Sequence, residues 1–328
     1  MEAIEVTASA RLHLGFYNFL NNRIAYGSLG LAIDRPVIRV VVRRRGELLV
    51  NNYTDEYIDD IIEHVVDRLD VPGAEISIYS TIPRHVGLGS TTQLSLAIGY
   101  ALTRLYGLGY SIRELALRLG RGYVSGIGIA AFEKGGFIID SGRRLGDNGL
   151  LNHPRTIYDL PKPIYWSKVP GDWRFIVIVP NGSRGLDESV EEELMRKPEP
   201  LPSDLQLQLY SALVMDIVPG VSLNDIDRFS QGLYKIQFTT GKYFMKHQGG
   251  IFCCRETEEI IRHMLDSNIV GVGQSSWGPV AYGVVRGSKK AKRLLEKILY
   301  NLKQEGIEPR QVFIAKPRNT GFHVRVHR

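Results

Sequence analysis

The sequence predicts an α+β protein of two domains, and three observations lead to this fold class. Strand-like and helix-like segments alternate in both halves of the chain, a glycine- and hydroxyl-rich turn joins a strand to a long apolar helix, and an aperiodic polar stretch separates the halves. With 328 residues, 44% of them hydrophobic, the chain suits two moderate domains. We expect an N-terminal domain over residues 1–165 and a C-terminal domain over 166–328.

The N-terminal half alternates short strands with longer helices. Its expected strands are 4–8, 37–42, 74–80 and 137–140, and its expected helices are 57–69 and 90–106. A third helix begins after Ser111, because Glu114 follows at the spacing of a capping box. The stretch 143–170 is rich in Pro, Asn, Gly and Asp, so it is the best candidate for the boundary between the domains.

The C-terminal half predicts an open sheet with helices on one side. Its expected strands are 173–179, 251–254, 280–285, 312–315 and 323–326, and its expected helices are 204–218, 224–247, 257–268 and 288–305. The polar, proline-punctuated segment 181–202 is able to order over a ligand. Segment 271–279 is expected to be a loop.

The turn between the third expected strand, 74–80, and the helix 90–106 has the composition of a phosphate-binding loop. Its two glycines allow backbone angles at which several amides converge on one anion. The helix that follows adds unpaired amides and the positive end of its dipole. The residues assigned to phosphate are His85, Gly87, Leu88, Gly89, Ser90, Thr91 and Thr92. Ser90 is also the candidate ligand for Mg²⁺, and a plain turn with a Ser/Thr N-cap is the alternative.

Composition limits the classes of partner. No apolar run approaches the roughly 20 residues that cross a bilayer, and the N-terminus lacks the pattern of a secretory signal, so we expect a cytoplasmic protein without a membrane partner. The net charge is +6, but the basic residues are scattered, so no nucleic-acid partner is expected. The two cysteines, Cys253 and Cys254, are adjacent and are interpreted as small buried strand residues.

Two further loops carry chemically suggestive residues. The first contains Arg11 and His13, followed by Arg23. The second places hydrogen-bond donors and an aromatic face between close-set glycines, in Gln274, Ser275, Ser276 and Trp277. A strand connection with a packed Trp277 is the structural alternative for this second loop.

Together these loops resemble a known superfamily. Pro83 and the run Gly87-Leu88-Gly89-Ser90 match the second motif of the GHMP superfamily, which is a proline, three residues and Gly-Leu-Gly-Ser. Segments 11–15, 85–93, 120–128, 135–140 and 273–279 are similar to the archaeal β-ribofuranosylaminobenzene 5'-phosphate synthases, and they span nearly the whole chain. The resemblance implies an N-terminal domain like ribosomal protein S5 domain 2, a C-terminal ferredoxin-like domain and a ligand cleft between them.

The resemblance also implies a reaction. Such synthases join phosphoribosyl pyrophosphate (PRPP) to 4-aminobenzoate and release pyrophosphate and CO₂, in the pathway to methanopterin-type cofactors. Small-molecule substrates and Mg²⁺ are then the expected partners, and a homodimer is left open. The expected catalytic residues are Arg11, His13, Arg23 and Asp140.

Each of these residues has an expected role. The two arginines are anion contacts, since a guanidinium pairs its donors with phosphate or carboxylate. His13 is either catalytic or bonded to backbone, and Asp140 is either an acid, base or metal ligand or a loop cap. Gln274, Ser275 and Ser276 are expected to orient the sugar phosphate or the aromatic acid, with Trp277 beside the flat ring.

Two alternatives remain at this point. An ATP-dependent small-molecule kinase would use the same loop, but mevalonate-type kinases have a catalytic aspartate in a Ser-Gly-x-Asp motif where this chain has Gly128. A catalytically silent ligand sensor is supported by Asn18, which stands where the synthases usually have an aspartate. The same departure leaves the acceptor open between 4-aminobenzoate, 4-hydroxybenzoate and another aromatic acid.

Overall fold

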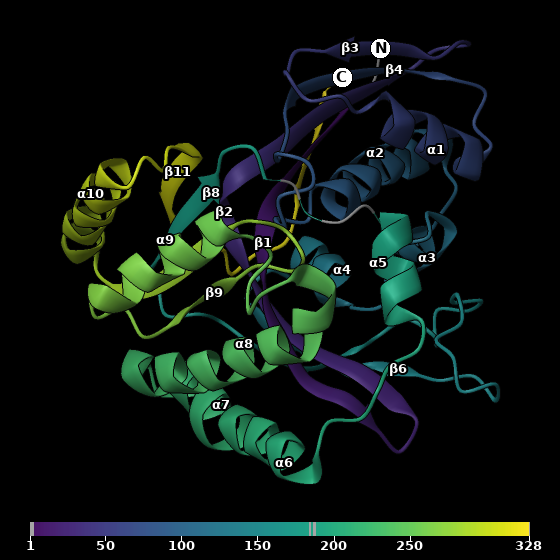
Figure 1. The fold of residues 1–328 in the computed structure, drawn as a ribbon. Coiled ribbons are helices and arrows are strands. Elements are labelled where there is room, and N and C mark those ends of the chain that lie inside the picture. The colour runs from purple at the N-terminus through teal and green to yellow at the C-terminus, as the bar shows by residue number, and fades with distance from the viewer. Residues whose placement is uncertain (1–2, 184, 186–187, 328) are drawn as a thin grey trace.

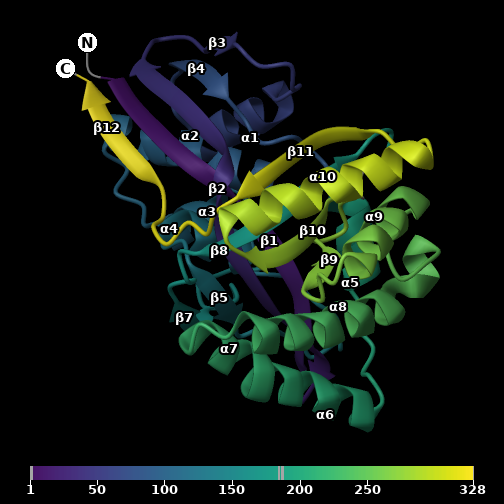
Figure 2. The ribbon, with the colours of Figure 1, turned by 90° about the vertical axis from the view of Figure 1, so that its left-hand side faces the viewer.

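The computed structural model describes residues 3–183, 185 and 188–327 and contains two sheets. The larger sheet is built on a long hairpin, β1 paired with β2, and has the order β12-β1-β2-β4-β3, with β5 and β6 also paired to β2 and β7 paired to β5. Its strands are β1 (Ala3–Asn21), β2 (Ile24–Arg44), β3 (Leu49–Asn52), β4 (Ala74–Ser80), β5 (Phe137–Asp140), β6 (Arg143–Arg144), β7 (Pro163–Ser167) and β12 (His323–His327). Because β12 pairs with β1, the two ends of the chain lie side by side (Figures 1 and 2).

Four helices pack around the larger sheet and bring the glycine turn to it. They are α1 (Asp59–Leu69), α2 (Ser90–Tyr106), α3 (Ile112–Arg118) and α4 (Ile127–Glu133). Helix α2 contacts both β1 and β2 and is buried along most of its length, which its apolar sequence allows. The capping box predicted at Ser111 and Glu114 is confirmed at the start of α3.

The second sheet is antiparallel and has the order β11-β8-β10-β9. Its strands are β8 (Trp173–Pro180), β9 (Val272–Gln274), β10 (Ala281–Arg286) and β11 (Pro309–Ala315). Alternate residues of β8 enter different cores: Ile176 and Ile178 pack in the cluster with α9 (Arg255–Asp266) and α10 (Ser288–Gln304), whereas Val177 and Val179 join the main core. The helices α9 and α10 therefore cover one face of this sheet, as expected (Figure 2).

A helical layer packs against the half of the β1–β2 hairpin that contains its turn (Figure 1). It comprises α6 (Ser203–Ser211), the π-helical segment η1 (Ala212–Ile217), α7 (Val218–Ser222) and α8 (Ile226–Gln248). Helices α6 and α8 both contact β1, and α8 also contacts β9, so α8 links the two sheets (Figure 1). The short α5 (Glu188–Met195) precedes this layer in the chain.

Several expected elements are confirmed, and others are corrected. The strands expected at 74–80 and 137–140 and the helix at 90–106 have the predicted bounds, whereas 4–8 and 37–42 are parts of much longer strands. The strand expected at 251–254 is wrong. There the backbone bonds to side chains instead of to a neighbouring strand: Cys253 N–H donates to Gln274 Oε1 at 2.7 Å, and Ile251 O accepts from Gln248 Nε2 at 2.7 Å.

Segments 271–279 and 181–202, expected to be irregular, both contain regular structure. The expectation that 181–202 orders over a ligand lies partly outside the described residues. The 271–279 loop begins with the strand β9, and segment 181–202 contains α5. Residues 184 and 186–187 of the expected ligand-covering segment lie outside the described part of the chain. The division at residue 165 stays a prediction. No helix among the described residues is long and apolar enough to cross a membrane.

Candidate active site

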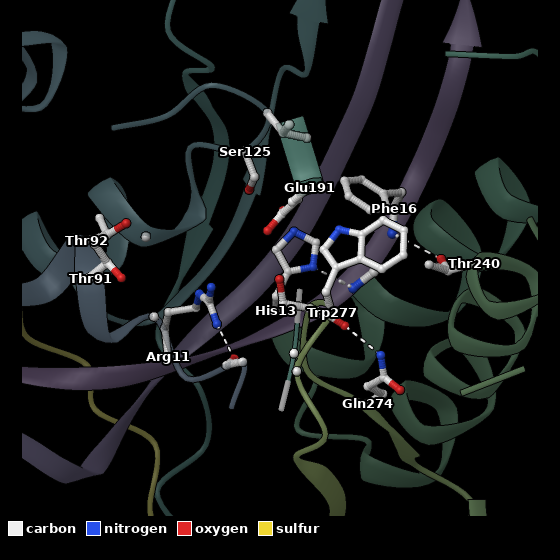
Figure 3. A pocket seen from close by; sticks show the side chains of 18 of the residues that line it. Arg11, His13, Phe16, Thr91, Thr92, Ser125, Glu191, Thr240, Gln274 and Trp277 are labelled. Atoms are coloured by element: carbon white, nitrogen blue, oxygen red, sulfur yellow. Dashed lines mark hydrogen bonds between the residues drawn. The ribbon is translucent and has the colours of Figure 1, made fainter. Parts of the chain in front are cut away.

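The glycine turn forms one end of a cavity that residues from both halves of the chain line (Figure 3). Gly87 and Gly89 have φ angles of +92° and +83°, which favour glycine, and α2 begins at the next residue, Ser90. Of the predicted phosphate residues, His85, Gly87, Gly89, Ser90, Thr91 and Thr92 line the cavity. Leu88 is in the core, and its carbonyl accepts from the Arg11 N–H at 3.1 Å. The turn therefore presents backbone, hydroxyls and a helix N-terminus to one space.

Arg11 places a partly buried positive charge beside this turn. Its Nη1 donates to the carbonyl of Gly87, and its guanidinium lies against Gly89, where an added Cβ would be 3.2 Å from Nε. Burial lowers the pKa of Arg11 to about 10, although the nearby charge of Glu191 opposes this effect. The guanidinium remains charged at neutral pH. Arg11, which the sequence predicted as an anion contact, therefore places a positive charge at the turn.

Ser275 holds the turn to the C-terminal half. Its side chain is fully buried, its Oγ donates to Gly87 O at 2.7 Å, and it accepts from the His13 N–H at 3.0 Å. The two loops are in direct backbone contact, since a Cβ added to Gly278 would lie 2.0 Å from the Val86 carbonyl carbon. Ser275 thus holds the glycine turn in place through Gly87, and the cavity lining contains its neighbours Gln274, Ser276 and Trp277.

His13 lines the cavity as a neutral ring. Burial, assisted by the charge of Arg11, lowers the pKa of His13 to about 3. Its Nδ1 accepts the N–H of Gly15 at 3.3 Å. A neutral imidazole that accepts at Nδ1 carries its proton on Nε2, so His13 is a hydrogen-bond donor here and is no base at Nδ1.

The other end of the cavity is aromatic. Trp277 packs edge-on against Phe244 with ring centres 4.6 Å apart, and Phe16 lies 6.0 Å from Phe244. In Figure 3, Thr91, Thr92 and Arg11 lie on one side of the view and Phe16 and Thr240 on the other, with His13 and Trp277 between them. The sequence predicted Trp277 as part of the site. It missed Phe16, which directly follows the segment 11–15, and it missed the cavity-lining residues of α8. For α8 the sequence indicated a helix by its periodicity and nothing more.

Gln274 has a more structural position than expected. Its Oε1 accepts from Cys253 N–H, its Nε2 donates to Ser276 O at 2.9 Å, and its own N–H donates to Gln237 Oε1 at 2.9 Å. Ser276 adopts a left-handed φ of +57°. Gln274 therefore shapes the loop that presents Trp277.

Asp140 lies behind the cavity wall. Its carboxylate is fully buried and accepts from the N–H groups of Ser28, Gly126 and Gly142 at 3.0, 2.7 and 3.0 Å. It also accepts from the hydroxyls of Ser28 and Ser125 at 2.6 and 3.2 Å. Burial raises the pKa of Asp140, and these hydrogen bonds oppose the rise. Of the two alternatives, this geometry fits a loop-fastening carboxylate, because both oxygens are occupied.

Two other polar residues lie apart from the cavity. Arg23 follows the end of β1, half-exposed, and pairs with Asp147 at 2.8 Å, so the structure does not bring it to Arg11. Asn18 is buried: its Nδ2 donates to Ile24 O at 2.8 Å, and its Oδ1 accepts from the Tyr210 hydroxyl at 2.8 Å. Asn18 therefore fastens the hairpin.

Carboxylates reach the cavity from a different place than expected. Glu191 and Glu192 of α5 line it, together with Arg121 and Ser125. In Figure 3, Glu191 points toward the space beside His13 and Ser125. The sequence missed both glutamates, because an acidic helix in a polar segment is usually a solvated face. With the hydroxyls of α2, they supply the hard oxygen atoms that Mg²⁺ prefers.

Comparison with known proteins defines the class. Residues 56–136 match the N-terminal domain model of the GHMP kinases. Homoserine kinase from Cytophaga hutchinsonii has the same fold, with a TM-score of 0.68 and 17% identity over 98% of this chain and 97% of that one. Mevalonate diphosphate decarboxylase from Staphylococcus aureus superposes with a TM-score of 0.63 at 12% identity, covering 99% and 98%. The chain has the GHMP-kinase fold, as its motifs predicted.

More specific relatives share nearly the whole chain. The protein is similar to the Beta-ribofuranosylphenol 5'-phosphate synthase of Methanocaldococcus jannaschii, with 29% identity over 97% of this chain and 99% of the relative. The protein of the same name from Archaeoglobus fulgidus is 28% identical over 98% and 100%. The resemblance to the archaeal synthases that the motifs indicated is thereby confirmed.

Proposed function

We propose that this protein is a decarboxylating phosphoribosyltransferase of the β-ribofuranosylphenol or β-ribofuranosylaminobenzene 5'-phosphate synthase type. The observation that carries the proposal is the two-ended cavity, in which the glycine turn, suited to an anion, and the partly buried Arg11 face an aromatic wall. PRPP supplies an anionic group for the turn and a benzoate supplies a flat ring for the aromatic wall. The archaeal relatives carry a synthase name.

The anion end suits the leaving pyrophosphate. When the bond from C1 of the ribose to the pyrophosphate oxygen breaks, negative charge collects on the leaving group, where preorganised donors and cations stabilise it. Arg11 and the amides and hydroxyls of residues 87–92 supply these donors. Ser90, Glu191 and Glu192 would hold Mg²⁺, which supplies charge neutralisation for the pyrophosphate.

The aromatic end suits the acceptor. Phe16, Phe244 and Trp277 offer apolar walls to a flat ring, and His13 Nε2–H is a donor for the oxygen or carboxylate of the acceptor. The relatives' name specifies a ribofuranosyl phenol, so 4-hydroxybenzoate is the first acceptor to test and 4-aminobenzoate the second.

The bond changes of the proposed reaction do not require a base that abstracts a proton from the ring. The ring carbon that bears the carboxylate forms the new bond to C1, and that carbon then loses CO₂, whose bonding electrons restore the aromatic ring. Because CO₂ leaves in place of a proton, no side chain has to deprotonate the ring. The neutral His13 and the enclosed Asp140 are consistent with this route.

The position of Gly128 is consistent with a synthase more than with a kinase. Gly128 lies in the first turn of α4, where an added Cβ would sit 3.1 Å from Thr92 Cγ2. A kinase of the mevalonate type places its carboxylate base at this motif position, but glycine offers no side chain to deprotonate a substrate hydroxyl.

The test measures labelled CO₂ and pyrophosphate released from carboxyl-labelled 4-hydroxybenzoate or 4-aminobenzoate with PRPP and Mg²⁺, beside a matched reaction with ATP. Equimolar release of both products supports the synthase. ADP formation with candidate alcohols, and no CO₂ from either acid, would overturn it in favour of a kinase. Binding of PRPP without turnover would instead indicate a sensor.

A variant pair tests the turn itself. Ser90→Ala removes a hydroxyl from the anion end and should weaken pyrophosphate binding by about fivefold to tenfold with the fold intact. Ser95→Ala is the control, because Ser95 is buried in the same helix and does not belong to the described cavity lining. Equal affinities for the two variants would contradict the assignment of the turn.

A further inference from the structure

The two cysteines form a pair of neighbouring thiols beside the cavity. Cys253 Sγ and Cys254 Sγ are 3.4 Å apart, and Thr257 Oγ1 lies 3.5 Å from the first and 3.1 Å from the second. Both residues are partly exposed. They lie in the irregular segment before α9, and Cys254 is the N-cap residue of that helix.

The environment of the pair favours a reactive thiolate. The Cys253 thiol donates to Cys254 Sγ, and this hydrogen bond, with smaller contributions from Ser183 and Thr257, lowers the pKa of Cys254 to about 6 despite burial. The N-terminus of α9 also favours negative charge at this position. Cys254 is therefore the nucleophile of the pair and Cys253 the thiol that can resolve an adduct on it.

The pair is joined to the cavity wall through one side chain. Cys253 N–H donates to Gln274 Oε1, and Gln274 Nε2 holds the carbonyl of Ser276, one residue before Trp277. Ile251 and Phe252, directly before the cysteines, line the cavity. A change in the backbone at 253–254 therefore acts on the aromatic end of the cavity.

We propose that Cys253 and Cys254 are a modification site, a vicinal dithiol that a low-molecular-weight disulfide oxidises reversibly to a Cys253–Cys254 disulfide. The Cys254 thiolate attacks the reagent RS–SR, which forms a mixed disulfide on Cys254 and releases one RS⁻. The Cys253 thiol then loses its proton and attacks Cys254 Sγ, which forms the intrachain disulfide and releases the second RS⁻. Two cysteine thiols are oxidised, and one reagent disulfide is reduced to two thiols.

Closing this bond must move the backbone. Adjacent Cα atoms are about 3.8 Å apart, which is shorter than the roughly 4.4–6.8 Å between the Cα atoms of most disulfides. The backbone on both sides of Cys253 has to adjust, because rotation of the Cys253–Cys254 peptide is passed on to the preceding peptide unit. That unit carries the Cys253 N–H, which therefore loses its alignment with Gln274 Oε1. The loop that carries Trp277 then loses a support, and turnover should fall by about tenfold.

The experiment uses the full chain and oxidised glutathione, with intact-mass spectrometry and the CO₂-release assay as readouts. The chain has two cysteines in all, so no other thiol competes. Wild-type protein should become lighter by two hydrogens without a retained adduct, whereas Cys253→Ser should keep one glutathione on Cys254. Dithiothreitol should restore the original mass and turnover, and a Cys253→Ser/Cys254→Ser variant should be as active as reduced wild type and insensitive to the reagent.

The mass change does not depend on the proposed function. Only the expected effect on turnover rests on that function. Retention of two glutathiones by the wild type, or a disulfide-linked dimer, would overturn the dithiol site. A correct mass change with unaltered turnover would overturn its link to the cavity. Absence of CO₂ release from fully reduced protein would count against the synthase alone, because the mass change would still be observed.

Discussion

Ser275→Ala is the change that most directly tests how the cavity is assembled. The wild-type hydroxyl bridges two segments: it donates to Gly87 O at 2.7 Å and accepts from His13 N–H at 3.0 Å, and the side chain is fully buried. Alanine leaves the His13 N–H without this partner, whereas Gly87 O keeps the donor Arg11 Nη1. An orphaned buried group costs about 1–3 kcal/mol, so the free energy of unfolding should fall by about 1–3 kcal/mol.

The matched control is Ser267→Ala. Ser267 is also buried, but its Oγ has no hydrogen-bond partner among the described residues. Both substitutions remove one oxygen atom, so the difference between the variants isolates the two hydrogen bonds of Ser275. The control should be neutral or slightly stabilising, since it removes an unsatisfied polar atom.

Urea unfolding followed by circular dichroism measures the two free energies, and titration calorimetry measures pyrophosphate affinity with Mg²⁺. Ser275→Ala should also weaken pyrophosphate binding by roughly tenfold, because the turn is no longer held at Gly87. Equal unfolding free energies for the two variants would refute the reasoning. A destabilised variant with unchanged pyrophosphate affinity would show that the turn keeps its shape without Ser275.

Three other predictions follow from buried groups. Arg11→Lys keeps the charge but loses the planar fork of donors, so calorimetry should show pyrophosphate affinity reduced by about 10- to 100-fold; unchanged affinity would place the anion elsewhere. His13 is neutral in the fold and protonated in the unfolded chain below its ordinary pKa of 6.5, so its contribution to stability is complete above pH 6.5 and is lost as pH falls toward 3. Between pH 6 and 5 the free energy of unfolding of the wild type should fall by about 1.2 kcal/mol more than that of His13→Asn in urea unfolding, and parallel pH profiles would contradict this. Asp140→Asn should lower the free energy of unfolding by about 3 kcal/mol or more and lower the melting temperature, because an amide hydrogen would face the donors of Ser125 and Gly126. An unchanged melting temperature would show that Asp140 does not fasten the loop.

The sequence was most informative where structure is local. The bounds of α2, the left-handed glycines of the phosphate turn and the capping box of α3 all depend on residues within a few positions of one another, and all were predicted correctly. The superfamily was likewise predictable, because its motifs are short runs whose spacing is visible in the chain.

The sequence was less informative about the role of each polar side chain. Arg11 and Arg23 had the same expected role, yet Arg11 lies partly buried at the turn and Arg23 pairs with Asp147 at the surface. Residue type states what a side chain can bind, but its role depends on which groups the fold brings within reach.

By itself, the sequence determined the fold class, the glycine turn before α2 and the resemblance to the synthases, because backbone preferences, periodicity and motifs are properties of neighbouring residues. Only the tertiary structure decided which residues share the cavity. Ser275 supports Gly87 across 188 positions of sequence, and α8 contributes Phe244 to a wall begun by Phe16. Such pairings arise when separate segments bury their apolar faces together and must satisfy the polar groups enclosed with them, and no local pattern specifies the partner.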